Sequence, residues 1–298
     1  MAAGKRVKKN MTKNTGTVVF SIAFVELLRL LNPFVILYSL WSYRDLIGQL
    51  IKREVGQRYR GSYLGVLWSF ITPFLMLMIY TFVFSMIFKS SWQAGTETPI
   101  GEFALTLFAG LAAFNLFSEV VNRAPTLILT VPNYVKKVVF PVEILPVVAV
   151  GSALVNSLIA SGLVIAGSIL LRGRLSPTIF ILPLSYLPLC FLSLGLGWFL
   201  SSLGVYIRDI GQGINIFVQM LFFLSPVFYP TSAIPETFQD VISINPLTLI
   251  LTEFRQTLLW GEMIDLKAWG LWFTLTFVLA ILGYVWFTKT KKGFADVM

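Results

Sequence analysis

Basic side chains are concentrated in one short stretch of this sequence, where they could bind anionic groups. The stretch KREVGQRYRGSYLGVLWSFITP, residues 52–73, begins with several basic residues and continues directly into an apolar segment. A basic element in that position can contact anionic lipid head groups or the surface of a second protein. The sequence has no histidine and one cysteine, so it lacks the commonest general base and the usual metal-ligand clusters.

The composition is that of a membrane protein. Of the 298 residues, 56% are hydrophobic and 12% are charged, with a mean hydropathy of +0.80. Soluble proteins carry about 25% charged residues. A net charge of +9 would suggest nucleic acid as the partner of a soluble protein. Here most basic residues flank apolar segments, so we expect contacts with membrane lipids and no nucleic-acid partner.

Six apolar segments are long enough to cross a bilayer, because a transmembrane helix needs about 20 mostly apolar residues. We therefore predict an all-α membrane protein with six spans. The spans are expected at 64–88, 103–121, 142–171, 178–206, 214–230 and 268–288. The fifth ends in LSPVFYP, whose two prolines should break or kink it. In the fourth, the glycine pattern of Gly195, Gly197 and Gly204 should permit close helix packing.

The residues before the first span are expected to form two further parts. Residues 1–42 are predicted to be a basic tail and an interfacial or re-entrant segment, because Glu26, Arg29 and Pro33 interrupt an otherwise apolar run. Residues 43–63 are predicted to be an amphipathic interface helix, which leaves 64–298 as the transmembrane domain. In the helix, Leu46, Ile47, Leu50, Ile51 and Val55 recur on one face, and Asp45, Gln49, Lys52 and Arg53 lie on the other. The polar face is either a lipid anchor or a docking surface for a cytoplasmic partner.

The distribution of Lys and Arg orients the spans. These residues are concentrated before residue 64, in the 122–141 loop and after residue 288, whereas acidic residues prevail in 89–102 and 231–267. Since positive loops stay in the cytoplasm, we predict cytoplasmic termini and a multi-pass protein of the cell inner (cytoplasmic) membrane. Arg172 and Arg174 disagree with this topology, because they would face outward.

Several motifs occur in an order that resembles a known family. They are RDLIGQLIKREVGQRYRGSYLGVLWSFITP, NYVKKVVFPVEILP (133–146), VYIRDIGQ (205–212), LSPVFYP (224–230) and INPLTLILTEFRQTLLWG (244–261). Over about residues 40–298 the chain resembles the permease subunits of ABC exporters for polysaccharides and polyol phosphates. That family includes the O-antigen (Wzm), capsule (KpsM) and teichoic acid (TagG) permeases.

This resemblance implies a homodimeric permease with two copies of a separate nucleotide-binding ATPase subunit. ATP and Mg would bind in that partner, and no cofactor or metal is expected in this chain, which has no phosphate-binding loop motif. The chain is therefore not expected to be an enzyme. The interface helix and a coupling element at 122–136 would meet the ATPase through Asp45, Gln49, Lys52, Arg53 and Arg123. Short re-entrant helices are expected on the outer side, at 231–262.

The substrate implied by the resemblance is a lipid-linked polysaccharide, with O-antigen as the first expectation and capsule or teichoic acid next. Aromatic faces stack on the apolar faces of sugars and tolerate sliding. The candidate channel residues are Trp68, Phe70, Phe74, Tyr80, Thr81, Phe84, Phe114, Phe117, Phe228 and Tyr229. Packing against lipid or neighbouring helices is the simpler explanation for any single one of them.

Three alternatives remain open at this point. The first is an ABC permease that moves a drug or a simple lipid. The second is a membrane-embedded glycan-modifying enzyme, which the scattered carboxylates and the missing histidine disfavour. The third is a secondary transporter, which should show repeated broken helices, whereas only 224–246 is strongly broken.

Overall fold

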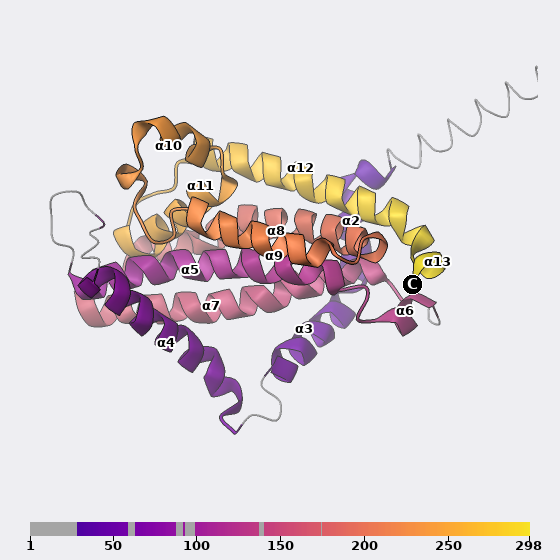
Figure 1. Ribbon diagram of the computed structural model, residues 1–298, viewed down its shortest axis with the longest axis horizontal. Coiled ribbons are helices and arrows are strands. Elements are labelled where there is room, and N and C mark those ends of the chain that lie inside the picture. The colour runs from indigo at the N-terminus through magenta and orange to yellow at the C-terminus, as the bar shows by residue number, and fades with distance from the viewer. Residues whose placement is uncertain (1–28, 59–62, 88–91, 93–98, 137–139, 174) are drawn as a thin grey trace, which may run out of the picture. The chain divides into compact units, whose positions relative to one another are not determined.

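The computed structural model describes residues 29–58, 63–87, 92, 99–136, 140–173 and 175–298, and these form helices and no strand (Figure 1). The all-α prediction is therefore confirmed for the described part of the chain. The longer helices are α2 (Pro33–Ser42), α3 (Arg44–Arg58), α4 (Trp68–Thr81), α5 (Ile100–Arg123), α7 (Leu145–Arg172), α8 (Leu182–Tyr206), α9 (Ile210–Leu224), α10 (Glu236–Ser243), α11 (Pro246–Arg255) and α12 (Leu266–Thr290). The shorter ones are η1 (Gly65–Leu67), η2 (Phe82–Ile87), η3 (Ala124–Thr126), α6 (Pro132–Lys136), η4 (Val142–Ile144), η5 (Pro177–Ile181), η6 (Thr231–Ala233), η7 (Gln256–Trp260), η8 (Lys291–Gly293) and α13 (Phe294–Val297).

Four helical stretches of the described chain are long and apolar enough to cross a membrane. They are Ile100–Thr126, Val142–Arg172, Pro177–Tyr206 and Leu266–Val297, and each contains or overlaps a predicted span. The other two predicted spans correspond to shorter apolar helices, α4 and α9. The π-helical segment η2 directly continues α4. Six crossings with cytoplasmic termini therefore stay a prediction.

The chain divides into two compact units, Met1–Asp45 and Leu46–Met298. In the first unit, residues 29–31 are helical, Asn32 is not, and Pro33 begins helix α2, so the helical segment is interrupted at this proline. The Asn32 side chain caps this helix by accepting a hydrogen bond from the Phe34 amide at 3.0 Å. Residues 18–28 of the expected interfacial segment lie outside the described residues.

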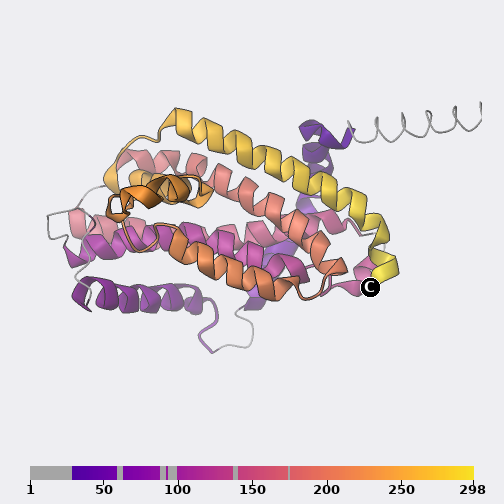
Figure 2. The same cartoon turned by 45° about the horizontal axis from the view of Figure 1, so that its top comes forward.

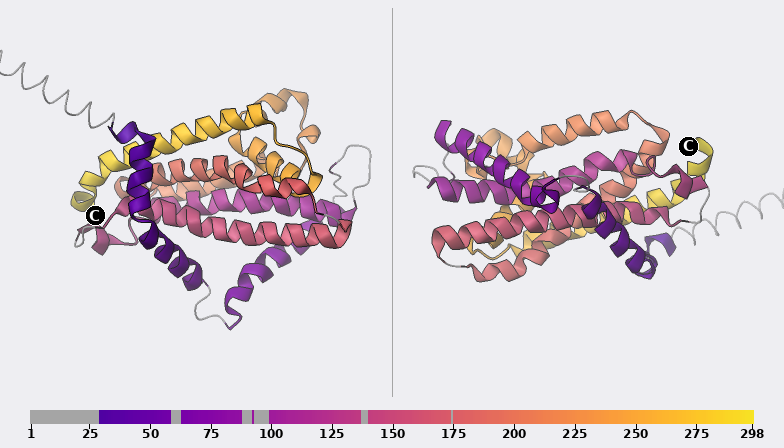
Figure 3. Two further views of the ribbon diagram at one scale, coloured as in Figure 1. Left: turned by 180° about the vertical axis from the view of Figure 1, so that it is seen from behind. Right: turned by 90° about the horizontal axis from the view of Figure 1, so that it is seen from below.

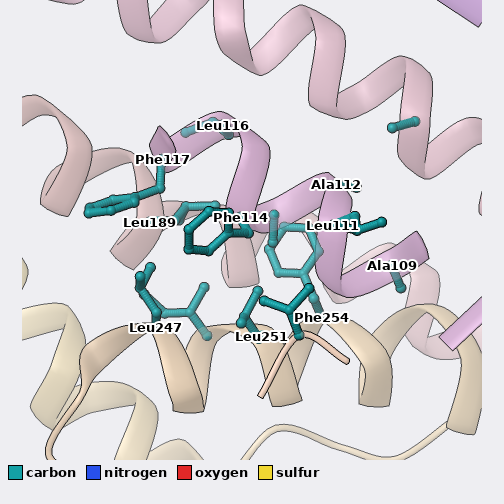
Figure 4. Packing of buried hydrophobic residues seen from close by; sticks show 14 of the residues in the cluster. Ala109, Leu111, Ala112, Phe114, Leu116, Phe117, Leu189, Leu247, Leu251 and Phe254 are labelled. Carbon is teal, nitrogen blue, oxygen red and sulfur yellow. The ribbon is translucent and has the colours of Figure 1, made fainter. Parts of the chain in front are cut away.

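Helix α5 is the most deeply buried long helix of the second unit. It packs along α7, while α8 packs along α12 (Figure 1). Figure 4 shows Leu111, Phe114 and Phe117 of α5 meeting Leu189 of α8 and Leu251 of α11 in one continuous apolar core. Figure 2 shows α9 running beside α5 as well. Helix α5 is therefore surrounded by protein on most sides.

Glycines let α8 approach its neighbours closely, as the fourth-span pattern predicted. A Cβ atom on Gly195 would lie 2.8 Å from the Leu279 carbonyl oxygen of α12, and one on Gly204 would overlap the Pro125 backbone of η3. At Gly197 a Cβ would make ordinary contacts at 3.5 Å. Close packing is thus confirmed at Gly195 and Gly204, where only a hydrogen fits.

Helix α9 ends earlier than the predicted 214–230 span. Its last residue is Leu224, and Ser225 is extended at φ −97° and ψ 145°. The residue before a proline is pushed toward extended backbone, so Pro226 stops the helix here. The prediction that the prolines break this segment is confirmed, whereas the predicted end at residue 230 is wrong.

The segment predicted to hold short outer helices contains η6, α10, α11 and η7. Arg255 at the end of α11 is only 2% exposed and holds three parts of the chain together. Its guanidinium donates to the backbone oxygens of Thr106 (3.0 Å), Pro226 (2.7 Å) and Val227 (2.8 Å). It also lies 4.3 Å from the ring centre of Trp92, within cation–π range.

An ion pair bears on the one loop that disagreed with the predicted orientation. Arg172 pairs with Glu102 at 3.2 Å, and it also donates to the Leu259 backbone oxygen. The pair gives Arg172 a partner on α5, but its position still disagrees with the predicted orientation, because the rule counts Lys and Arg and not net charge. Arg174 lies outside the described residues.

Candidate functional site

A pocket of about 500 Å³ lies where α4 faces α5 and α7. Helix α4 contributes Trp68 and Tyr80 from its two ends, and Phe108 of α5 and Phe222 of α9 also line the pocket. Its polar wall is formed by α5 and α7 and contains Asn115, Glu119 and Asn156. The pocket therefore places aromatic rings opposite amide and carboxylate groups, a combination that suits ligands with both apolar faces and hydroxyl groups.

Two side chains of the polar wall have spare hydrogen-bonding capacity. Asn156 donates from its amide nitrogen to Glu119 at 3.2 Å, whereas its side-chain oxygen is buried and has no hydrogen-bond partner. Asn115 is exposed and lines the same pocket. An unpaired buried acceptor costs about 1–3 kcal/mol, so a donor brought to this wall by a ligand would be stabilised there.

A cluster of ion pairs lies next to the pocket and joins α3 to α5. Arg58 of α3 binds Glu119 of α5 through both terminal nitrogens, one at 3.0 Å. Arg123 of α5 pairs with Glu54 of α3 and lies 3.4 Å from Glu119. We call Glu54, Arg58, Glu119 and Arg123 the ion-pair cluster. Two acidic and two basic side chains make it electrically balanced.

Helix α7 completes the cluster through a hydroxyl group. The Ser152 hydroxyl accepts a hydrogen bond from Arg58 and donates one to Glu54, each at 2.7 Å. Nearby, Ile51 of α3 packs into the space left by Gly151 of α7. Figure 3 shows α3 approaching the other helices at one end and diverging from them along the rest of its length. Helix α3 is thus held to the helices of the pocket by polar and apolar contacts together.

The spacing of the charges explains why the cluster forms. Glu54 and Arg58 are four residues apart on α3, and Glu119 and Arg123 are four apart on α5. Residues i and i+4 share one face of a helix, with Glu preceding Arg in the favourable order. Each helix therefore presents one acidic and one basic group side by side, and two such pairs can neutralise each other.

The structure places the predicted ATPase-coupling residues in two environments. Asp45, Gln49, Lys52 and Arg53 are exposed on the polar face of α3, while the apolar residues of the opposite face are half-buried. Arg123 instead belongs to the ion-pair cluster, with 37% of its side chain exposed. This exposure is consistent with two faces, and the interface and coupling roles of the helix stay predictions.

The predicted channel residues are likewise divided. Trp68 and Tyr80 line the pocket, and Phe70 and Phe74 are exposed on the surface of α4. Phe114, Phe117 and Phe228 are buried in the core. Tyr229 is partly buried, and its hydroxyl donates to the Phe223 backbone oxygen at 2.8 Å. The Thr81 hydroxyl is buried without a hydrogen-bond partner. The Phe84 side chain lies outside the described residues.

Sequence reasoning missed Asn115, Glu119 and Asn156 as pocket residues and Glu54 and Arg58 as cluster residues. A signal for the cluster existed, since EVGQR (54–58) and EVVNR (119–123) share the same Glu-x-x-x-Arg spacing beside predicted spans. The pocket asparagines carried no comparable signal. Among the described residues, no group of three metal-ligating side chains comes together.

Similarity to known proteins extends over most of this chain. The ABC-2 type transporter family matches residues 45–259. The chain is 26% identical over 263 residues to the O-antigen export system permease protein RfbA of Klebsiella pneumoniae, covering 88% of this chain and 98% of that protein. It is 27% identical over 219 residues to the RfbA permease of Myxococcus xanthus, covering 73% and 81% of the two chains. It is 26% identical over 219 residues to the polysialic acid transport protein KpsM of Escherichia coli, covering 71% and 80%.

Proposed function

Because the chain belongs to the ABC-2 type transporter family, we propose that it is the permease subunit of an ATP-driven exporter of lipid-linked polysaccharide. O-antigen is the first candidate substrate, with capsule or teichoic acid next. The observation that carries this proposal is the similarity, over most of the chain, to proteins named for O-antigen export and polysialic acid transport. The chain would lie in the cell inner membrane and span it six times.

The pocket supplies a place for sugars along the export path. Trp68 and Tyr80 can stack on the apolar faces of sugar rings, and Asn115 and Asn156 can exchange hydrogen bonds with hydroxyl groups. A volume of about 500 Å³ has room for a sugar unit and not for a folded polymer. A polymer would therefore pass this site one segment at a time.

ATP hydrolysis would take place in a separate nucleotide-binding subunit, present in two copies. The exposed polar face of α3, with Asp45, Gln49, Lys52 and Arg53, is the proposed contact for that subunit, together with the 122–136 region. The ion-pair cluster supports this assignment, because it connects α3 directly to α5 and α7. A displacement of α3 by the ATPase would reach the pocket through these bonds.

The proposal includes a homodimer because the family resemblance implies one, and aromatic side chains on α4 and α9 are exposed where a second copy or lipid would cover them. On α4, Phe70, Phe74 and Phe82 near its end are exposed, and on α9 Phe217 and Phe223 are exposed. Contact between two copies would cover such aromatic surface and could bring two pockets to a shared path. The segment from η6 to η7 is the proposed outer gate, in which Arg255 holds α11 to α5.

The test is ATPase activity of the purified chain, alone and co-expressed with the ATPase encoded beside it, with and without lipid-linked polysaccharide. We expect activity only in the complex, and a change in rate when the polysaccharide is added. A double charge reversal, Lys52→Glu with Arg53→Glu, should prevent assembly of the complex. Lys267→Glu, which reverses an exposed charge on the predicted outer side, is the matched control. A complex that responds to a drug or simple lipid, and not to the polysaccharide, would contradict the proposed substrate.

A further inference from the structure

Glu119 belongs to both the pocket and the ion-pair cluster. Its carboxylate lines the pocket, accepts from Asn156 at 3.2 Å and binds Arg58 of α3. We propose that a sugar residue bound in the pocket competes for Glu119, weakens its bonds to Arg58 and so loosens the contact between α3 and α5. Glycan binding in the pocket would then change the contact of α3 with the ATPase subunit. This inference rests on the proposed function and deepens it.

The hydrogen-bond inventory of Glu119 makes such competition feasible. A carboxylate has about four acceptor positions, and those of Glu119 already serve Arg58, Arg123 and Asn156. A sugar hydroxyl that donates to Glu119 must therefore share or displace one of these donors. Arg58 supplies two of the four bonds, so it is the donor with which a sugar hydroxyl competes most. Two neighbouring hydroxyls of one sugar could act together, one donating to the buried Asn156 oxygen and the other donating to Glu119 in competition with Arg58.

The cluster is exposed enough to open. The side chains of Arg58 and Glu119 are 25% and 23% exposed, so they lie between a surface ion pair and a fully buried one. Partly exposed ion pairs are weak compared with buried ones, which makes them reversible contacts. A ligand shifts such an equilibrium only by its different affinities for the two states. Here the difference would come from a Glu119 that is free to accept from the sugar once Arg58 has left.

The first test compares variants of the cluster with variants of the pocket in the assembled complex. Arg58→Ala should raise the basal ATPase rate about fivefold, which corresponds to about 1 kcal/mol, and should abolish further stimulation by glycan. Asn156→Ala should instead raise about tenfold the glycan concentration that gives half-maximal stimulation. Lys291→Ala is the matched control, because it removes a 3.3 Å ion pair with Glu143 that lies outside the pocket. Its basal rate and its glycan response should match those of the unaltered chain.

The second readout is hydrogen exchange of the backbone amides of residues 46–58. The probe is lipid-linked polysaccharide purified from the source membranes, and the comparison is the same lipid carrier without its glycan. Glycan should speed exchange in this segment of the unaltered complex, and Arg58→Ala should show fast exchange without it. A response to the bare lipid carrier would overturn the assignment of the pocket to sugar.

The two proposals fail in different ways. If the unaltered complex does not respond to the polysaccharide, the proposed function falls, and this inference falls with it. If the unaltered complex responds, and Arg58→Ala keeps both the normal basal rate and the normal response, only the link through Glu119 is wrong. Should Arg58→Ala not assemble, an unchanged half-maximal concentration for Asn156→Ala would overturn the inference by itself.

Discussion

Replacing Arg255 with methionine should destabilise the fold by about 3 kcal/mol. The substitution removes three hydrogen bonds to the backbone oxygens of Thr106, Pro226 and Val227 and the contact with Trp92. Each buried oxygen left without a donor costs about 1–3 kcal/mol, and a desolvated cation–π contact contributes about 2 kcal/mol. The loss is offset by several kcal/mol, because the methionine variant avoids the desolvation cost of a buried charge.

The assay is unfolding of the purified chain by SDS in mixed micelles, with the free energy of unfolding compared between variants. Arg255→Lys keeps the charge but cannot reproduce the planar fork, so it should fall between methionine and the unaltered chain. Arg172→Met is the matched control, because this arginine also reaches a backbone oxygen but has 21% of its side chain exposed. We expect Arg172→Met to lower the free energy of unfolding by about 1 kcal/mol. If the free energy of unfolding of Arg255→Met lies within about 1 kcal/mol of that of the unaltered chain, the cost of burying the charge cancels the hydrogen bonds, and the reasoning is refuted.

Two further predictions concern a buried carboxyl group and a helix crossing. Burial, with a smaller contribution from Asp265, raises the pKa of Glu253 from 4.5 to about 7. Between these two pKa values the folded chain holds a proton that the unfolded chain releases. The free energy of unfolding should therefore fall as the pH rises from about 4.5 to about 7. Glu253→Gln should remove this decline when unfolding is measured across that range. Gly283→Ala should lower the unfolding midpoint, because its Cβ would overlap the Gly195 backbone. Gly162→Ala, which meets open space, should have little effect in the same assay.

The positions of the helices could be read from the sequence because their physical cause is local. Helices α5, α7, α8 and α12 each occupy an apolar run of about 20 or more residues, and a helix is one of the few structures such a run can form in a bilayer. The end of α9 could be placed approximately for the same reason, since Pro226 acts on the residue beside it. The two faces of α3 followed from helical spacing alone.

The pocket and the ion-pair cluster could not be read in the same way, because they depend on distant contacts. Arg58 and Glu119 are 61 residues apart, and Glu54 and Ser152 are 98 apart. One sequence shows that each of these groups needs a partner, but several partners satisfy that need equally well. The aromatic residues show a similar limit. Phe114 is 3% exposed and Phe74 is 54% exposed, although both lie in apolar helices.

Helix α5 connects the ion-pair cluster to the contacts of Arg255. Glu119 and Arg123 lie at its C-terminal end in the ion-pair cluster, whereas Gly110 lies near its middle and leaves the space that the Arg255 guanidinium fills. An α-helix rises about 1.5 Å per residue and is stiff along its axis, so the nine residues from Gly110 to Glu119 span roughly 13 Å of rigid backbone. A shift of α5 along its axis would therefore change the contacts of Arg58 and Arg255 together. Because Arg255 also binds the backbone at Pro226 and Val227, such a shift would reach the segment that follows α9.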